Sequence, residues 1–209
     1  AYQQALEERT RTDFPEQWAG TQNNLGTAYC DRIRGDKADN LENAIAAYEQ
    51  ALEVRTRTDF PVDWAMTQNN LGTAYSDRIR GDKADNLENA IAAYQQALEV
   101  YTRTDFPVQW ATTQNNLGNA YRDRIRGDKA DNLENAIAAY QQALEERTRT
   151  DFPEQWAGTQ NNLGTAYCDR IRGDKADNLE NAIAAYEQAL EVRTRTDFPV
   201  DWAMTQNNL

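Results

Sequence analysis

The chain has no histidine, and only two cysteines among its 209 residues. The absence of histidine removes the usual general base and the commonest metal ligand at neutral pH. Cys30 and Cys168 stand far apart in the sequence and give no disulfide framework. Unpaired cysteines fit a reducing compartment, so a cytoplasmic location is expected.

Positive charge is also scarce. Lys and Arg total 22 against 34 Asp and Glu, which gives a formal net charge of −12. Nucleic-acid phosphates attract cationic surfaces, so no nucleic-acid partner is expected. The longest apolar stretches, such as residues 90–94, are far too short to span a bilayer, and no membrane partner is predicted.

A catalytic constellation is missing as well. Carboxylates are abundant, but they recur in polar loops, as Asp36 and Asp39 do. No nucleophile stands beside a candidate base, and no glycine-rich loop is built to hold a phosphate. The sequence therefore predicts no enzyme activity, no metal site and no cofactor.

What the chain does have is a repeat. Tryptophan occurs at positions 18, 64, 110, 156 and 202, always 46 residues apart, and only eight of the 46 columns vary between copies. Residues 139–209 repeat residues 1–71 without a change. We expect one array with partial copies at residues 1–12 and 197–209 and full copies at 13–58, 59–104, 105–150 and 151–196. A period in this range is typical of stacked helical hairpins.

Each copy predicts two helices. In the first, Trp64, Leu71, Tyr75 and Ile79 fall on one face, with Gln68 between them. Pro61 fits its first turn, where the missing N–H group costs nothing. Gly81 is expected to end this helix.

The second helix is expected to begin near Asp85–Asn86 and to end near Thr102–Arg103. Glu88, three residues after Asp85, resembles a capping box. Its apolar stripe consists of Leu87, Ile91, Tyr94 and Leu98. Ala90, Ala93 and Ala97 leave room for a neighbouring helix. Neither helix can bury its apolar face alone, so successive copies must stack into a solenoid.

These residues resemble the tetratricopeptide repeat family, whose motif runs W-x2-L-G-x2-Y, A-x3-F and then Pro. Each full copy carries Leu-Gly-x2-Tyr at 71–75 and Ala-x3-Tyr at 90–94, or their equivalents. The resemblance covers the whole chain and implies an all-α, right-handed superhelical solenoid of antiparallel helix pairs.

The copies depart from the family pattern in three ways. Gln68 occupies the family's tryptophan position, and Trp64 lies one turn earlier. The closing proline is absent, and the period of 46 residues exceeds the 34 of the family. Longer helices or loops are implied, so the superhelical pitch is not defined by the resemblance.

The resemblance also implies a binding surface, because the first helices line the concave groove in this family. Asn69 and Asn70 precede Leu71 where some family members hold extended peptides with asparagines. An asparagine amide carries a donor and an acceptor and can pair with a peptide N–H and C=O together. Equally, one asparagine of each pair could bond between repeats and only stabilise the stack. The variable columns at positions 20, 27 and 30 share this face, although any exposed face is free to vary.

The candidate groove residues share this register of the first helices. They are Asn23, Asn24, Thr27, Asp31, Met66, Asn69, Asn70, Thr73, Asp77, Thr112, Asn115, Asn116, Asn119, Arg122, Asp123, Asn161, Asn162 and Asp169.

We therefore expect a scaffold whose groove binds an extended segment of a protein or peptide partner, as one arm of a larger protein. The alternative is a structural spacer or a head-to-tail filament without a specific ligand. Near-identical copies favour the spacer, because a groove for one peptide usually differs from copy to copy. The chain begins inside a second helix and finishes inside a first one, which predicts continuation or self-association.

Overall fold

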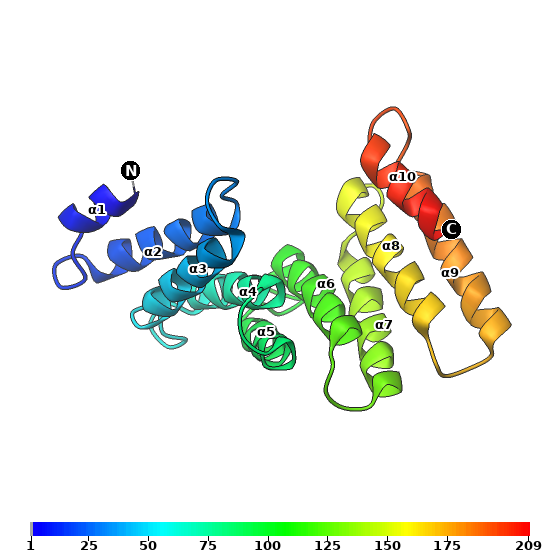
Figure 1. The fold of residues 1–209 in the computed structure, drawn as a ribbon, viewed down its shortest axis with the longest axis horizontal. Coiled ribbons are helices and arrows are strands. Elements are labelled where there is room, and N and C mark those ends of the chain that lie inside the picture. The colour runs from blue at the N-terminus through cyan, green and yellow to red at the C-terminus, as the bar shows by residue number, and fades with distance from the viewer. Residues whose placement is uncertain (1) are drawn as a thin grey trace. The chain divides into compact units, whose positions relative to one another are not determined.

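The computed structural model describes residues 2–209, and the regular structure in that range is entirely α-helical (Figure 1). The first helices of the repeats are α2 (Pro15–Cys30), α4 (Pro61–Asp77), α6 (Pro107–Asp123), α8 (Pro153–Asp169) and α10 (Pro199–Asn208). The second helices are α1 (Tyr2–Glu8), α3 (Lys37–Leu52), α5 (Lys83–Leu98), α7 (Lys129–Glu146) and α9 (Lys175–Leu190). This arrangement confirms the predicted all-α solenoid of helix pairs.

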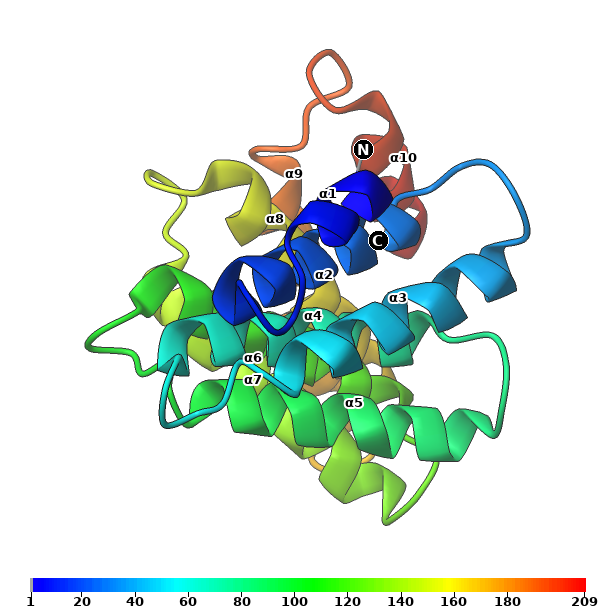
Figure 2. The same cartoon turned by 90° about the vertical axis from the view of Figure 1, so that its left-hand side faces the viewer.

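The chain forms two compact units, residues 1–102 with α1 to α5 and residues 103–209 with α6 to α10. Within each unit every helix packs on the next, and Figure 2 shows α1 to α5 following one another from blue to green. The first helices α2 and α4 also touch, as do α6 and α8. The second helices α3 and α5, or α7 and α9, do not pack together to this extent, so the first helices lie on the closer-packed side of each unit.

Each complete first helix begins at its proline, as predicted. Pro61 occupies the first turn of α4, where no N–H partner is needed. The helix ends at Asp77, four residues before Gly81, so the expectation that Gly81 ends it is wrong. Arg78 turns the chain out with φ −57° and ψ 127°. Ile79 consequently leaves the apolar face and is 62 % exposed, which contradicts its predicted burial.

The loop between the two helices instead sets the start of the second helix, through a turn at Gly81 and an N-cap at Asp82. Gly81 adopts φ +80°, a left-handed conformation that side chains disfavour. Asp82 follows as the N-cap, and its carboxylate accepts the backbone N–H of Asp85 at 2.9 Å. The buried amide of Asn86 donates to the backbone oxygen of Arg80 at 2.8 Å and fixes the loop from within.

These contacts correct the predicted bounds of the second helix. α5 begins at Lys83, earlier than the expected Asp85–Asn86, because Asp82 supplies the cap. It ends at Leu98, earlier than Thr102–Arg103. The loop sequence does not vary between copies because the glycine conformation, the aspartate cap and the buried asparagine each depend on one residue type.

The glycine of the Leu-Gly-x2-Tyr motif lies against an aromatic ring. A Cβ atom added to Gly72 would come within 2.7 Å of Cε1 of Tyr94 in the second helix of the same repeat. The same glycine–tyrosine contact occurs in every complete hairpin, at 2.6–2.7 Å. Gly72 therefore leaves room for the ring of Tyr94, and a larger residue at this position would collide with that side chain.

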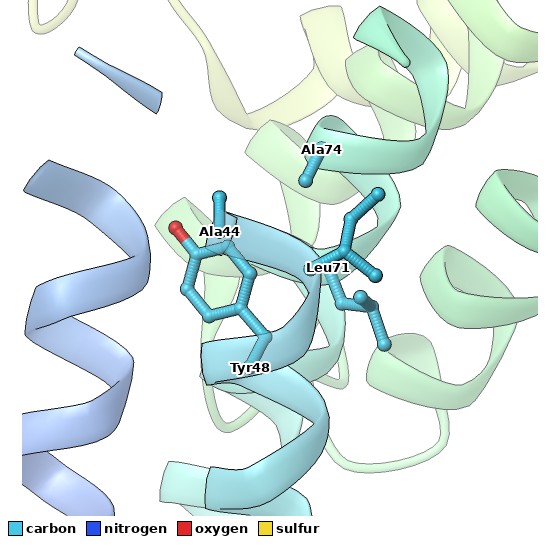
Figure 3. Packing of buried hydrophobic residues seen from close by; sticks show 5 residues of the cluster. Ala44, Tyr48, Leu71 and Ala74 are labelled. Carbon is cyan, nitrogen blue, oxygen red and sulfur yellow. The ribbon is translucent and has the colours of Figure 1, made fainter. Parts of the chain in front are cut away.

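The apolar core lies between successive repeats (Figure 3). Ala44 and Tyr48 of α3 meet Leu71 and Ala74 of α4, and Ile45 completes the cluster. The equivalent cluster in the second unit joins α7 to α8. Small alanines allow the helices to approach closely, while the tyrosine is the largest side chain of each cluster. No helix within residues 2–209 has the length and apolar character needed to cross a membrane.

Candidate functional site

The structure places the candidate groove residues on the first helices, except Asp31, which follows α2 as its C-cap. Seven are exposed: Asn24, Thr27, Asp31, Thr73, Asp77, Asp123 and Asp169. Nine are half-buried: Met66, Asn69, Asn70, Thr112, Asn115, Asn116, Asn119, Arg122 and Asn162. Asn23 and Asn161 are buried.

The paired asparagines form a ladder between adjacent first helices. In the first unit, Nδ2 of Asn70 donates to Oδ1 of Asn23 at 3.2 Å. In the second unit, Asn162 donates to Asn115, and Asn208 donates to Asn161, at 3.2 Å each. The second asparagine of one repeat thus bonds to the first asparagine of the repeat before it. One bond of this kind contributes about 1 kcal/mol, which explains why the helices tolerate these poor helix formers.

Two of the ladder steps leave side-chain hydrogen-bonding groups unused. Within residues 2–209, the Asn23 amide donates no hydrogen bond, and the Asn70 carbonyl oxygen accepts none. The pair formed by Asn115 and Asn162 leaves the same two groups without partners. Each of these two steps therefore leaves one side-chain donor and one side-chain acceptor without a hydrogen bond.

A row of tyrosine hydroxyls borders this ladder. The Tyr48 hydroxyl lies 3.1 Å from Oγ1 of Thr27 and 3.9 Å from Sγ of Cys30. In the third full repeat the Tyr140 hydroxyl donates to Oδ1 of Asn119 at 2.7 Å. The variable columns at positions 27 and 30 thus surround a fixed phenol in each repeat.

Burial decides the electrostatics of this row. Desolvation raises the pKa of Tyr186 to about 12, so the phenol stays neutral at physiological pH. Desolvation also raises the pKa of the half-buried Cys30 thiol. The Cys30 thiol is therefore protonated rather than nucleophilic at neutral pH.

Sequence reasoning missed a second set of polar residues that contact the first helices, the arginines that follow the second helices. Arg55 is buried at the end of the hairpin that contains α3, and its NH1 group donates to Oγ1 of Thr67 at 3.1 Å. Its NH2 group lies 3.3 Å from the Asp63 carboxylate of α4. The available signal was that the columns of Gln17 and Arg55 change in the same copy, to Asp63 and Tyr101, and return together to glutamine and arginine in the later full copies.

These features define a class of protein, an array of helical hairpins with a polar ladder along its first helices. Comparison with protein families gives the same result, since the tetratricopeptide repeat model matches residues 18–61, 64–107, 110–154 and 156–199. These matches cover most of the chain, which therefore belongs to the tetratricopeptide repeat family.

The fold is also similar to a solved structure. The crystal structure of BtubC (BKLC) from P. vanneervenii shares the fold with a TM-score of 0.70 and 23 % sequence identity. The similarity covers 94 % of this chain and 72 % of that one. A comparison with curated proteins gave no match. Tetratricopeptide repeats in general serve as non-catalytic scaffolds for protein–protein interaction.

Proposed function

We propose that this chain is a scaffold that binds an extended segment of a partner protein along the asparagine ladder and performs no catalysis itself. The observation that carries the proposal is the unused donor and acceptor at the ladder steps Asn23/Asn70 and Asn115/Asn162. An extended peptide presents alternating N–H and C=O groups and can pair with both. Packing of α2 on α4 and of α6 on α8 supports a ladder on the inner side of each unit.

The ladder recognises backbone rather than side chains, so sequence preference must come from the columns around it. Met66, Thr112 and Arg122 differ from their counterparts in other repeats and lie half-buried beside the asparagines. The net charge of −12 favours a basic or neutral partner segment over a strongly acidic one.

A library of displayed linear peptides is the test. A peptide selected on the whole chain is measured against the double variants Asn23→Ala/Asn70→Ala and Asn115→Ala/Asn162→Ala. We expect each pair to weaken binding at least tenfold, which corresponds to about 1.4 kcal/mol. Methylation of alternate peptide nitrogens should weaken binding in the same way, because the backbone N–H groups are lost.

The matched control is the pair Asn43→Ala/Asn89→Ala on α3 and α5, where the asparagines are exposed and lie on the second helices. Each ladder variant also loses one hydrogen bond between repeats, so its free energy of unfolding should fall by about 1 kcal/mol. If folded ladder variants bind like the control, the ladder only stabilises the stack, which is the spacer or filament alternative.

A further inference from the structure

Three buried or half-buried arginines lie at equivalent positions just after the second helices α3, α7 and α9. Arg55, Arg147 and Arg193 each donate from NH1 to a threonine of the following first helix. These bonds reach Thr67 at 3.1 Å, Thr159 at 2.9 Å and Thr205 at 3.1 Å. Each threonine hydroxyl donates in turn to the backbone oxygen four residues earlier, so its lone pairs face the guanidinium.

The arginines differ in how their charge is neutralised. NH2 of Arg55 lies 3.3 Å from the Asp63 carboxylate, and NH2 of Arg193 lies 3.6 Å from that of Asp201. Glu16 adds a second, more distant negative charge near Arg55. Both carboxylates of the ion pairs belong to the first turn of the following first helix.

Arg147 has neither an aspartate ion pair nor a nearby glutamate charge to neutralise it. The position of Asp63 is taken by Gln155 in α8, and the position of Glu16 is taken by Val108 in α6. NH2 of Arg147 donates instead to Oγ1 of Thr112 at 3.1 Å, and no carboxylate within residues 2–209 pairs with it. Burial lowers the pKa of this guanidinium without an opposing charge, yet an arginine remains protonated at neutral pH.

The result is a half-buried cation with spare donors at the rim of the first-helix face. A guanidinium carries five N–H groups, and the bonds to Thr112 and Thr159 engage one on NH1 and one on NH2. Thr112 and Arg147 are both half-buried, whereas the paired Arg55 and Arg193 are buried. Arg9 shares the column but is exposed, and no first helix of its own repeat precedes it within residues 2–209.

We propose that Arg147 is a specificity site that binds one carboxylate of an acidic side chain on the partner segment. The proposal rests on the proposed function, because the partner must lie along the first helices. The chain itself indicates the ligand chemistry, since an aspartate carboxylate contacts the equivalent guanidinium in two other repeats. Thr112 and Thr159 hold the guanidinium in place, which reduces the conformational entropy lost on binding.

The experiment observes the arginine side chains of the whole chain by nitrogen-15 NMR, with the Arg147 signal assigned from its loss in Arg147→Lys. The probe is N-acetyl-aspartate methylamide, which has one carboxylate and two peptide groups, and the asparagine analogue is its neutral match. We expect a saturable shift of the Arg147 signal with the acid and at least a tenfold weaker response to the amide. Inorganic phosphate is the third probe, and a response at lower concentration than the acid would overturn the carboxylate assignment.

The controlling variant is Gln155→Asp, which restores the internal carboxylate found at Asp63 and Asp201. It should abolish the response, whereas Gln142→Asp, which adds the same charge at an exposed position of α7, should leave it intact. An unchanged response in Gln155→Asp would overturn the proposal. So would an equal response of the exposed Arg9, because simple surface ion pairing would then explain both.

The outcome is separable from that of the proposed function. The variant Asn115→Ala/Asn162→Ala keeps Arg147 and its threonine partners, so the response to the acid should persist there at reduced affinity at most. A response at Arg147 together with peptide binding that ignores the asparagines would support the carboxylate site and refute the ladder. Ladder-dependent peptide binding without a response at Arg147 would refute the site alone.

Discussion

Two glycines in α8 allow the close contact with tyrosine to be measured almost in isolation. Both Gly158 and Gly164 lie inside the helix Pro153–Asp169. A Cβ atom at Gly164 would come within 2.7 Å of Cε1 of Tyr186, whereas one at Gly158 would meet only NH2 of Arg193, at 3.4 Å. Equivalent repeats carry Met66 and Thr112 in the Gly158 column, so a side chain is accepted there.

Replacing either glycine with alanine favours the helix by about 0.5–1 kcal/mol, because alanine loses less backbone entropy on folding. For Gly164→Ala this gain is opposed by displacement of the Tyr186 ring, which must retreat by roughly 0.7 Å to reach ordinary contact. The ring is buried, and its hydroxyl is bonded to Thr165 at 3.2 Å, so it cannot swing away freely. Overpacking of this kind costs about 1–3 kcal/mol.

We therefore expect Gly158→Ala to be neutral or stabilising and Gly164→Ala to be less stable than it by about 1–3 kcal/mol, since the helix terms cancel. Urea unfolding of the whole chain, with hydrogen exchange of α8 as a local check, measures the difference. In the background Tyr186→Leu the difference should shrink, because the rigid ring is gone. Equal stability of the two alanine variants, or an unchanged difference in the leucine background, would refute the steric explanation.

Three further predictions follow from single contacts. Asp82→Ala should lower the free energy of unfolding by about 1 kcal/mol in a urea titration, and a larger loss for Asp85→Ala would contradict the cap assignment. A hydrogen bond from Arg78 lowers the pKa of Glu42 below 4.5, so this pair stabilises the fold above that pH and the stabilisation is lost as pH falls through the lowered value. Glu42→Gln should thus cost less than about 1 kcal/mol at neutral pH and flatten the acid limb of the stability curve, and an unchanged acid limb would show that the pair does not contribute. Burial raises the pKa of Tyr186 to about 12, so burial of the neutral phenol stabilises the fold below the ordinary tyrosine pKa, and this stabilisation is lost as the pH rises toward 12. Tyrosinate absorbance should therefore show one tyrosine that ionises at unusually high pH, and Tyr186→Phe should remove this signal. A normal titration of Tyr186 would contradict its burial.

The sequence by itself determined the repeat period, the pairing of helices and, apart from Ile79, the apolar faces that they bury. These properties are local, because Pro61 fixes a helix start and Leu87, Ile91 and Tyr94 recur at helical spacing. The first residue of the second helix was harder to predict from the sequence, since Asp82 and Asp85 are both plausible N-caps. Only the backbone geometry after Gly81 selects Asp82.

Only the tertiary structure decided which polar side chains form hydrogen bonds or ion pairs between repeats and which do not. Asn70 bonds to Asn23, 47 residues away, because stacking brings adjacent first helices together at that register. Arg147 lacks an ion-pair partner, and the position that Asp63 and Asp201 occupy in the other repeats holds Gln155 instead. Such contacts depend on the rise and rotation from one repeat to the next, which helical periodicity within one repeat does not specify.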